Sequence, residues 1–166
     1  MKSPLTPRSL APARAAADTA ELEAAVGFWL RLAQQRDLRA FNDRFDVAGV
    51  SQLAYAMLLV LDANPGCRPA ALAAAVRVRP PNLVDPLDAL VREGLVSRKP
   101  DPRDGRAQAL ALTAEGRKRL DGLKSVHAGL IEGYRAGLGS KDYDDLVRLL
   151  RRFVDQGRDG EDHQGP

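Results

Sequence analysis

Residues 94–116 constrain the fold of this chain most, because they combine two short strand patterns, a tight turn and the start of a helix. Residues 95–100 and 106–113 predict two strands around the turn Pro-Asp-Pro-Arg-Asp-Gly. Leu110 and Leu112 alternate with alanines in the second strand, so its larger apolar side chains fall on one side. The stretch therefore predicts a β-hairpin that leads directly into a helix.

Helical patterns surround this hairpin. Hydrophobic residues make up 45% of the chain and aromatic residues only 5%, and a composition dominated by alanine and leucine favours helices over sheet. Apolar spacing, caps and breakers predict six helices. Before the hairpin we expect a long helix from Asp18 or Thr19 to about residue 45, a central helix from Ser51, a short helix from Pro69 and a helix that stops at Gly94. After the hairpin we expect a helix that is capped by Thr113 and breaks at Gly137 and Gly139, and a last helix capped by Ser140. We therefore expect a mainly α fold with a small β-hairpin.

The length of 166 residues suits one domain with terminal extensions. Residues 1–17 are rich in Pro, Ala, Ser and Arg, and residues 158–166 are polar, so both are expected to be disordered segments beside a domain at residues 18–157. Cys67 is the single cysteine, which excludes an intramolecular disulfide and fits a reducing compartment. The chain shows no signal peptide, and its longest apolar run, at 53–61, is too short to span a bilayer. We expect a cytoplasmic protein without membrane contact.

Positive charge is concentrated in the middle of the chain. Residues 68–119 contain 11 Lys and Arg against 6 Asp and Glu, whereas residues 140–166 contain 5 against 7. A basic segment of this kind is typical of a surface that faces a polyanion. In this region, two helices joined by a tight turn and followed by the hairpin form the element order of a winged helix-turn-helix, over residues 48–113. The second helix of such a pair fits the DNA major groove, and the hairpin reaches the neighbouring minor groove.

Residues 94–116 resemble the MarR family of transcriptional regulators. The shared pattern consists of a Gly-Leu-Val strand entry, an Asp-Pro and an Asp-x-Arg in the wing, and a Leu-Thr-x-x-Gly that opens a helix. All parts are present, at residues 94–96, 101–102, 104–106 and 112–116. The resemblance in element order extends from about residue 19 to 156.

This resemblance implies a homodimer that binds double-stranded DNA. Residues 18–47 and 114–157 would form the dimerisation helices, and each subunit would bind half of a pseudo-palindromic operator. Arg106 is the wing arginine expected in the minor groove, with Asp104 holding its guanidinium group. Many members have an arginine just before it, where this chain has glycine, so Arg103 is the candidate for the second positive charge. The alternative interpretation is a charged hairpin tip that only keeps the wing soluble.

The helix before Gly94 supplies the candidates for base contacts, which are Arg79, Asn82 and Asp85. Arginine can pair with guanine and asparagine with adenine. The candidates for phosphate contacts are Arg68, Arg77 and Arg98. For each of these residues, a solvated surface group is the alternative.

Pro86 leaves two starts open for this helix. The helix can begin near Pro80 and kink at Pro86, where the lost backbone hydrogen bond costs about 3 kcal/mol. It can instead begin with Asp85 as its cap and Pro86 in its first position, which would shorten it and put the base contacts in doubt. The common face of Leu83 and Leu87 favours the longer helix.

Small anionic, often aromatic, ligands release members of the resembling family from DNA by binding between the two lobes. The candidates for the wall of such a pocket are Phe28, Trp29, Leu32 and Arg36 on the first helix and Tyr55 and Leu58 on the second. Arg36 could pair with a carboxylate. The alternative is that these residues form the dimer core beside a surface arginine.

Catalytic and metal chemistry find no support in the sequence. The chain has no His and Cys at metal-ligand spacing and no glycine-rich phosphate loop, so we expect no metal, no cofactor and no enzyme. Cys67 does not lie near the start of the first helix, where oxidant-sensing members carry a cysteine, so redox sensing is disfavoured. We expect a ligand-responsive transcriptional regulator that acts as a repressor. The alternative is a winged-helix protein-interaction module that has lost sequence-specific DNA binding.

Overall fold

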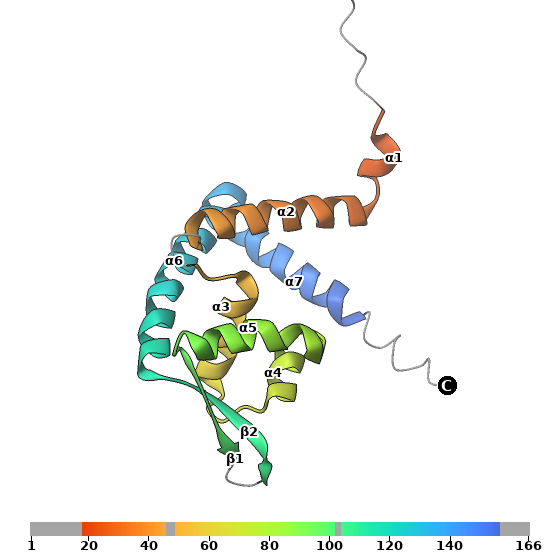
Figure 1. Ribbon diagram of the computed structural model, residues 1–166. Coiled ribbons are helices and arrows are strands. Elements are labelled where there is room, and N and C mark those ends of the chain that lie inside the picture. Colours follow the sequence, from red (N-terminus) through yellow and green to blue (C-terminus); the bar gives the residue numbers. More distant parts are fainter. Residues whose placement is uncertain (1–17, 46–48, 102–103, 157–166) are drawn as a thin grey trace, which may run out of the picture. The chain divides into compact units, whose positions relative to one another are not determined.

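The computed structural model of the chain describes residues 18–45, 49–101 and 104–156, with the backbone alone at residues 101 and 104–106. It is mainly helical with one antiparallel hairpin, as the sequence predicts (Figure 1). The elements are α1 (Ala20–Glu23), α2 (Val26–Phe45), α3 (Gln52–Ala63), α4 (Pro69–Ala75), α5 (Pro80–Arg92), β1 (Val96–Asp101), β2 (Asp104–Leu112), α6 (Ala114–Leu138) and α7 (Ser140–Gln156). The chain divides into two units, residues 1–36 and 37–166. Among the described residues, no helix is long and apolar enough to cross a membrane.

The predicted long first helix is wrong, because the first unit contains a break after Glu23. At the break, the N–H groups of Ala25 and Phe28 donate to carbonyls only three residues earlier, each at 3.1 Å. The indole Nε1 of Trp29 donates to the carbonyl of Glu23 at 2.8 Å and so satisfies one of the free carbonyls at the end of α1. A side chain six residues away therefore stabilises the interruption.

The central position of α3 in the second unit confirms the prediction from its apolar sequence. Ser51 caps the helix, because its hydroxyl accepts a hydrogen bond from the N–H of Ala54 at 3.2 Å. Met57, Leu58 and Leu61 are fully buried, and α3 contacts α4, α5, α6 and β2. The helices α4, α5 and α6 and the strand β2 are thus organised around one apolar helix.

The second strand of the hairpin begins two residues earlier than predicted, since β2 already starts at Asp104. Val96 pairs with Leu112, and Arg98 pairs with Leu110. Leu110 and Leu112 are buried as their alternation predicts. The hairpin extends from the end of the second unit where α4 and α5 lie, while α6 leads away from it and α7 folds back (Figure 1).

The boundaries of the last two helices correct two details. α6 continues through Gly137 to Leu138, and Gly139 is its C-cap residue, whose φ of 85° is unfavourable for other residues. Ser140 is the first residue of α7 and not its cap, since the carbonyl of Gly139 already accepts the N–H of Tyr143 at 3.0 Å. No residue of α7 is buried within one chain.

Candidate nucleic-acid interface

The corner between α4 and α5 is closed by two backbone hydrogen bonds. The N–H of Val78 donates to the carbonyl of Ala73 at 3.0 Å, and the N–H of Arg77 donates to the carbonyl of Ala74 at 3.2 Å, which is the Schellman pattern. Arg77 occupies the left-handed position of this motif with a φ of 56°, where glycine is usual. Its side chain reaches Asp155 of α7 at 3.4 Å. The corner thus carries an arginine in a conformation that arginine rarely adopts.

α5 begins at Pro80, so the longer of the two predicted helices is the one that forms. Arg79 is its N-cap residue with extended backbone, and two prolines fill the first positions, where a missing N–H removes no intrahelical bond. Pro86 lies inside the helix. Its missing N–H removes one hydrogen bond without ending the helix, which three buried leucines hold against the core: Leu83, Leu87 and Leu90.

The opposite face of α5 is open to solvent. Asn82 and Asp85 are both exposed on it, and Arg79 is exposed at its N-terminal end. All three candidates for base contacts are therefore accessible from outside. Their roles in base recognition stay predictions.

An ion pair between Arg98 and Asp88 joins the wing to α5. Nη2 of Arg98, on β1, contacts Oδ1 of Asp88. Arg98 is a predicted phosphate contact, whereas Asp88 is not among the site residues predicted from the sequence. A carboxylate on the flank of a helix that precedes a basic strand was the available signal. A phosphate contact of Arg98 would compete with Asp88 for the guanidinium group.

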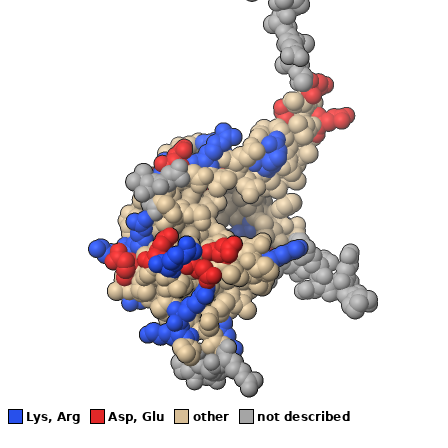
Figure 2. All heavy atoms as spheres, viewed as in Figure 1, with Lys and Arg blue, Asp and Glu red and all other residues tan. Residues whose placement is uncertain are grey.

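The remaining DNA candidates that the structure describes lie on β2 and at the start of α4. The backbone of Asp104 and Arg106 belongs to β2, and Asp104 pairs with Asp101 in the register. Arg103 lies outside the described residues. Arg68 is the exposed N-cap residue of α4, at the other side of the corner. Figure 2 shows Lys and Arg side chains above the hairpin tip and a mixture of acidic and basic side chains over the helices behind it.

The loop after α3 pairs with β2, which was not predicted from the sequence. The N–H of Gly66 donates to the carbonyl of Leu110 at 2.9 Å, and the N–H of Leu110 donates to the carbonyl of Cys67 at 2.8 Å. Burial raises the pKa of the Cys67 thiol, which keeps it protonated and poorly reactive. The backbone of Cys67 therefore pairs with β2 at the base of the wing, and its thiol is not set up for reaction.

The candidates for an effector pocket are divided between the two units. Phe28, Trp29, Leu32 and Arg36 lie on the part of α2 in the first unit. Tyr55 and Leu58 are buried in the core of the second unit, where the Tyr55 ring packs against Phe45 and His127. A role of these residues in ligand binding stays a prediction.

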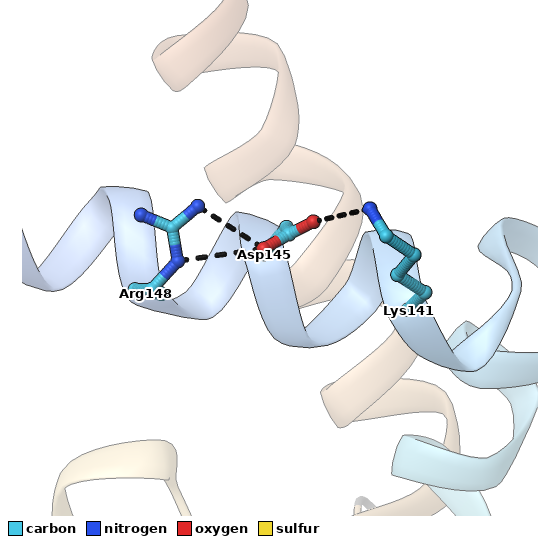
Figure 3. A network of polar contacts seen from close by, with 3 residues as sticks. All are labelled: Lys141, Asp145 and Arg148. Carbon is cyan, nitrogen blue, oxygen red and sulfur yellow. Dashed lines mark hydrogen bonds and ion pairs between the residues drawn. The ribbon is translucent and has the colours of Figure 1, made fainter.

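A groove of about 570 Å³ between α6 and α7 contains none of these candidates; it is lined by Arg135, Tyr143, Asp144, Val147, Arg148, Arg151, Arg152 and Asp155. On the polar face of α7, Asp145 accepts hydrogen bonds from Lys141 at 2.9 Å and from Arg148 at 3.0 Å (Figure 3). These bonds lower the pKa of the Asp145 carboxyl.

Within the described part of the chain, no group of three or more His, Cys, Asp or Glu could hold a metal ion.

A helix-turn-helix with an exposed second helix and a hairpin beside it defines the winged-helix class of DNA-binding proteins. The sequence pattern of the MarR family matches residues 48–107. Over 132 residues, the chain is 30% identical to a protein of Thauera aromatica named as transcriptional regulator of the hcr operon, covering 79% of this chain and 80% of the relative.

Solved structures give the same result. The transcriptional repressor CouR bound to a 23-mer DNA duplex is 30% identical, with a TM-score of 0.82 and coverage of 84% of this chain and 99% of CouR. CouR bound to p-coumaroyl-CoA is 30% identical, with a TM-score of 0.76 and coverage of 82% and 96%. The chain belongs to the MarR family, and it is a transcriptional regulator and not an enzyme.

Proposed function

We propose that this regulator binds a pseudo-palindromic operator as a homodimer, represses transcription there and is released by a small aromatic or anionic effector. The observation that carries the proposal is the solvent-exposed face of α5, held beside the wing by Arg98 and Asp88. With Asn82 and Asp85 at the base edges, the wing reaches the next minor groove, where Arg106 is the inserted residue. The similar repressor CouR is bound to a DNA duplex in its solved structure, which supports DNA binding by this chain.

The dimer is supported by the apolar face of α7. Five large side chains on this helix are exposed within one chain: Leu146, Leu149, Leu150, Phe153 and Val154. Contiguous apolar surface of this kind marks an interface with another protein surface. A two-fold dimer places two copies of α5 on two half-sites, which matches the symmetry of a palindromic operator. The regulator would act on this operator in the cytoplasm.

The effector class is supported by the second CouR structure. The ligand p-coumaroyl-CoA combines an aromatic acyl group with an anionic carrier. On the first-unit part of α2, Phe28, Trp29 and Leu32 are the candidates for contacts with the aromatic part, whereas Tyr55 and Leu58 are buried in the core of the second unit. The guanidinium of Arg36 would pair with an anionic group.

The test is fluorescence anisotropy of the purified protein with duplex DNA from the region upstream of its own gene. Wild type and Arg106→Ala are titrated across a salt series, beside a scrambled duplex. We expect sequence-dependent binding whose affinity rises as the salt concentration falls, because each phosphate contact releases counterions. Arg106→Ala should weaken binding, and it should lower the salt slope by about one per subunit if the wing arginine also neutralises a phosphate.

Lys141→Ala is the matched control, because it removes one exposed positive charge at the start of α7, at the end of the second unit away from the hairpin (Figure 1). It should bind the duplex like wild type. Duplexes selected from a random library are tested in the same way. If wild type binds none of these duplexes more tightly than scrambled DNA, the proposal that the protein is a repressor fails. The interaction-module alternative would then account for the winged helix.

A further inference from the structure

The large apolar side chains that are exposed in the described residues fall into three places. Two groups lie at residues 22–38 and 126–154, on the predicted dimerisation helices. Val84 alone lies between them, on α5, and 51% of its surface is exposed. It directly precedes Asp85, a candidate for a base contact, and at about 100° per residue it lies on the opposite flank of the helix from Asn82. A lone exposed valine is common on protein surfaces, but this one is exposed on the helix that enters the major groove in the proposed function.

Val84 lies on the flank of α5 that faces the wing. Residues four apart share one side of a helix, so Val84 lies one turn from Asp88, whose carboxylate binds Arg98 of β1. The neighbouring residue, Leu83, points into the core and fixes the rotation of the helix at this turn. Val84 therefore stands at the side of α5 from which the hairpin extends.

The side chain of Val84 is suited to a fixed apolar contact. A β-branched residue in a helix has one strongly preferred χ1 rotamer, so its two methyl groups keep one direction. It has no hydrogen-bonding group, so it gains nothing from a phosphate or from the polar edge of guanine, adenine or cytosine. Thymine alone presents a methyl group in the major groove, and apolar side chains read it by covering that methyl.

We propose that Val84 reads a thymine methyl group in each half-site of the operator. The inference rests on the proposed function, since it requires α5 in the major groove. It adds a residue that distinguishes bases by an apolar contact, beside the hydrogen-bonding candidate Asn82. Burial of one methyl group corresponds to about a fourfold change in affinity, and two symmetric half-sites multiply it to about fifteenfold.

The test uses uracil, which differs from thymine only by the missing methyl group. The preferred duplex of the full-length protein is selected from a random library. Symmetric pairs of its thymines are then replaced by uracil, one pair at a time. Affinities are measured by anisotropy for wild type, Val84→Ala and Asn82→Ala. The last variant is the control on the same helix, because it should lose a contact to a different base.

We expect one uracil pair to weaken wild type by about fifteenfold while leaving Val84→Ala unchanged. Val84→Ala should bind the thymine duplex about as weakly as wild type binds the uracil duplex, and Asn82→Ala should keep its sensitivity to uracil. The inference is overturned if no uracil pair affects wild type, or if Val84→Ala remains as sensitive as wild type. In both cases sequence-specific binding persists, and the proposed function stands. If selection enriches no duplex at all, the proposed function fails and this inference fails with it.

Discussion

The backbone carbonyl of Leu95 packs directly against Gly116, at the junction where α5 ends and β1 and α6 begin. A β-carbon at position 116 would lie 2.9 Å from the carbonyl carbon of Leu95 and closer still to its oxygen. Thr113 closes the same junction, because its Oγ donates to the carbonyl of Gly94 at 2.7 Å and accepts from the N–H of Gly116 at 2.9 Å. The junction therefore holds the exposed helix, the wing and α6 in one arrangement.

Replacing Gly116 by alanine should destabilise the protein strongly. The obstacle is the backbone of Leu95, which cannot rotate away like a side chain, so the junction must open. Overpacking of this kind costs about 3 kcal/mol in the free energy of unfolding. Urea denaturation followed by circular dichroism measures the loss as a lower midpoint with an unchanged slope.

Gly122→Ala is the matched control on the same helix. A β-carbon there would meet nothing within 4 Å. Alanine in a helix interior is favoured over glycine by about 0.5–1 kcal/mol, so this variant should be more stable than wild type. Equal effects of the two substitutions would show that the contact with Leu95 does not constrain the junction.

Arg77 gives a second prediction, because its left-handed backbone favours glycine. Arg77→Gly and Arg77→Ala both lose the contact with Asp155, which joins two largely exposed side chains. Only glycine relieves the strain of φ 56°. We expect the glycine variant to be more stable than the alanine variant by about 1 kcal/mol in urea denaturation. A more stable alanine variant would contradict the left-handed assignment.

The same pair of variants tests the role of Arg77 on DNA. If its guanidinium contacts a phosphate, both variants should bind every duplex more weakly, by a similar factor. The dependence of affinity on salt should fall by about one counterion per subunit. Asp155→Asn removes the competing carboxylate while keeping Arg77, and it should bind DNA at least as tightly as wild type.

Local signals account for the parts of the fold that the sequence predicted. Ser51, Pro69 and Thr113 act on backbone groups within a few residues, so their helix starts could be read directly. The long α5 was favoured because Leu83 shares a face with Leu87, and burial of that face outweighs the bond lost at Pro86.

Features that depend on distant contacts could not be predicted in the same way. The break after Glu23 needs the indole of Trp29, whose hydrogen bond to a carbonyl leaves no pattern in the sequence. The ion pair of Arg98 with Asp88 depends on β1 lying beside α5, because the two residues belong to different elements. An arginine in the left-handed position of a helix end likewise has no sequence signature, because glycine is the residue expected there.

The stability of the protein should fall at mildly acidic pH through His127. The ring of His127 packs against Tyr55 at 5.1 Å between centroids, and burial lowers the pKa of His127 from its ordinary value of 6.5, opposed by the charge of Asp37. As pH falls below 6.5, His127 becomes protonated in the unfolded chain but stays neutral in the folded chain. Protonation therefore stabilises the unfolded state, and the free energy of unfolding decreases. The loss is complete below the folded-state pKa.

His127→Phe keeps an aromatic ring against Tyr55 and removes the titrating group. Thermal melting from about pH 8 to pH 5 should show a smaller decline of Tm for this variant than for wild type, with the difference arising below the ordinary histidine pKa of about 6.5. Parallel curves for the two proteins would show that His127 does not couple protonation to folding.

The exposed face of α7 gives the last prediction, on assembly. Phe153 is 52% exposed within one chain, and it shares the helix face with Leu149 and Leu150. In a two-fold interface each substitution acts twice, so a buried charge at position 153 should raise the dimer dissociation constant by roughly two to three orders of magnitude. Sedimentation equilibrium should therefore find Phe153→Glu near the 18.0 kDa of one chain and wild type near twice that mass. Phe153→Leu, which keeps the face apolar, should remain dimeric. A helical, folded Phe153→Glu that still sediments as a dimer would place the subunit contact elsewhere than on this face of α7.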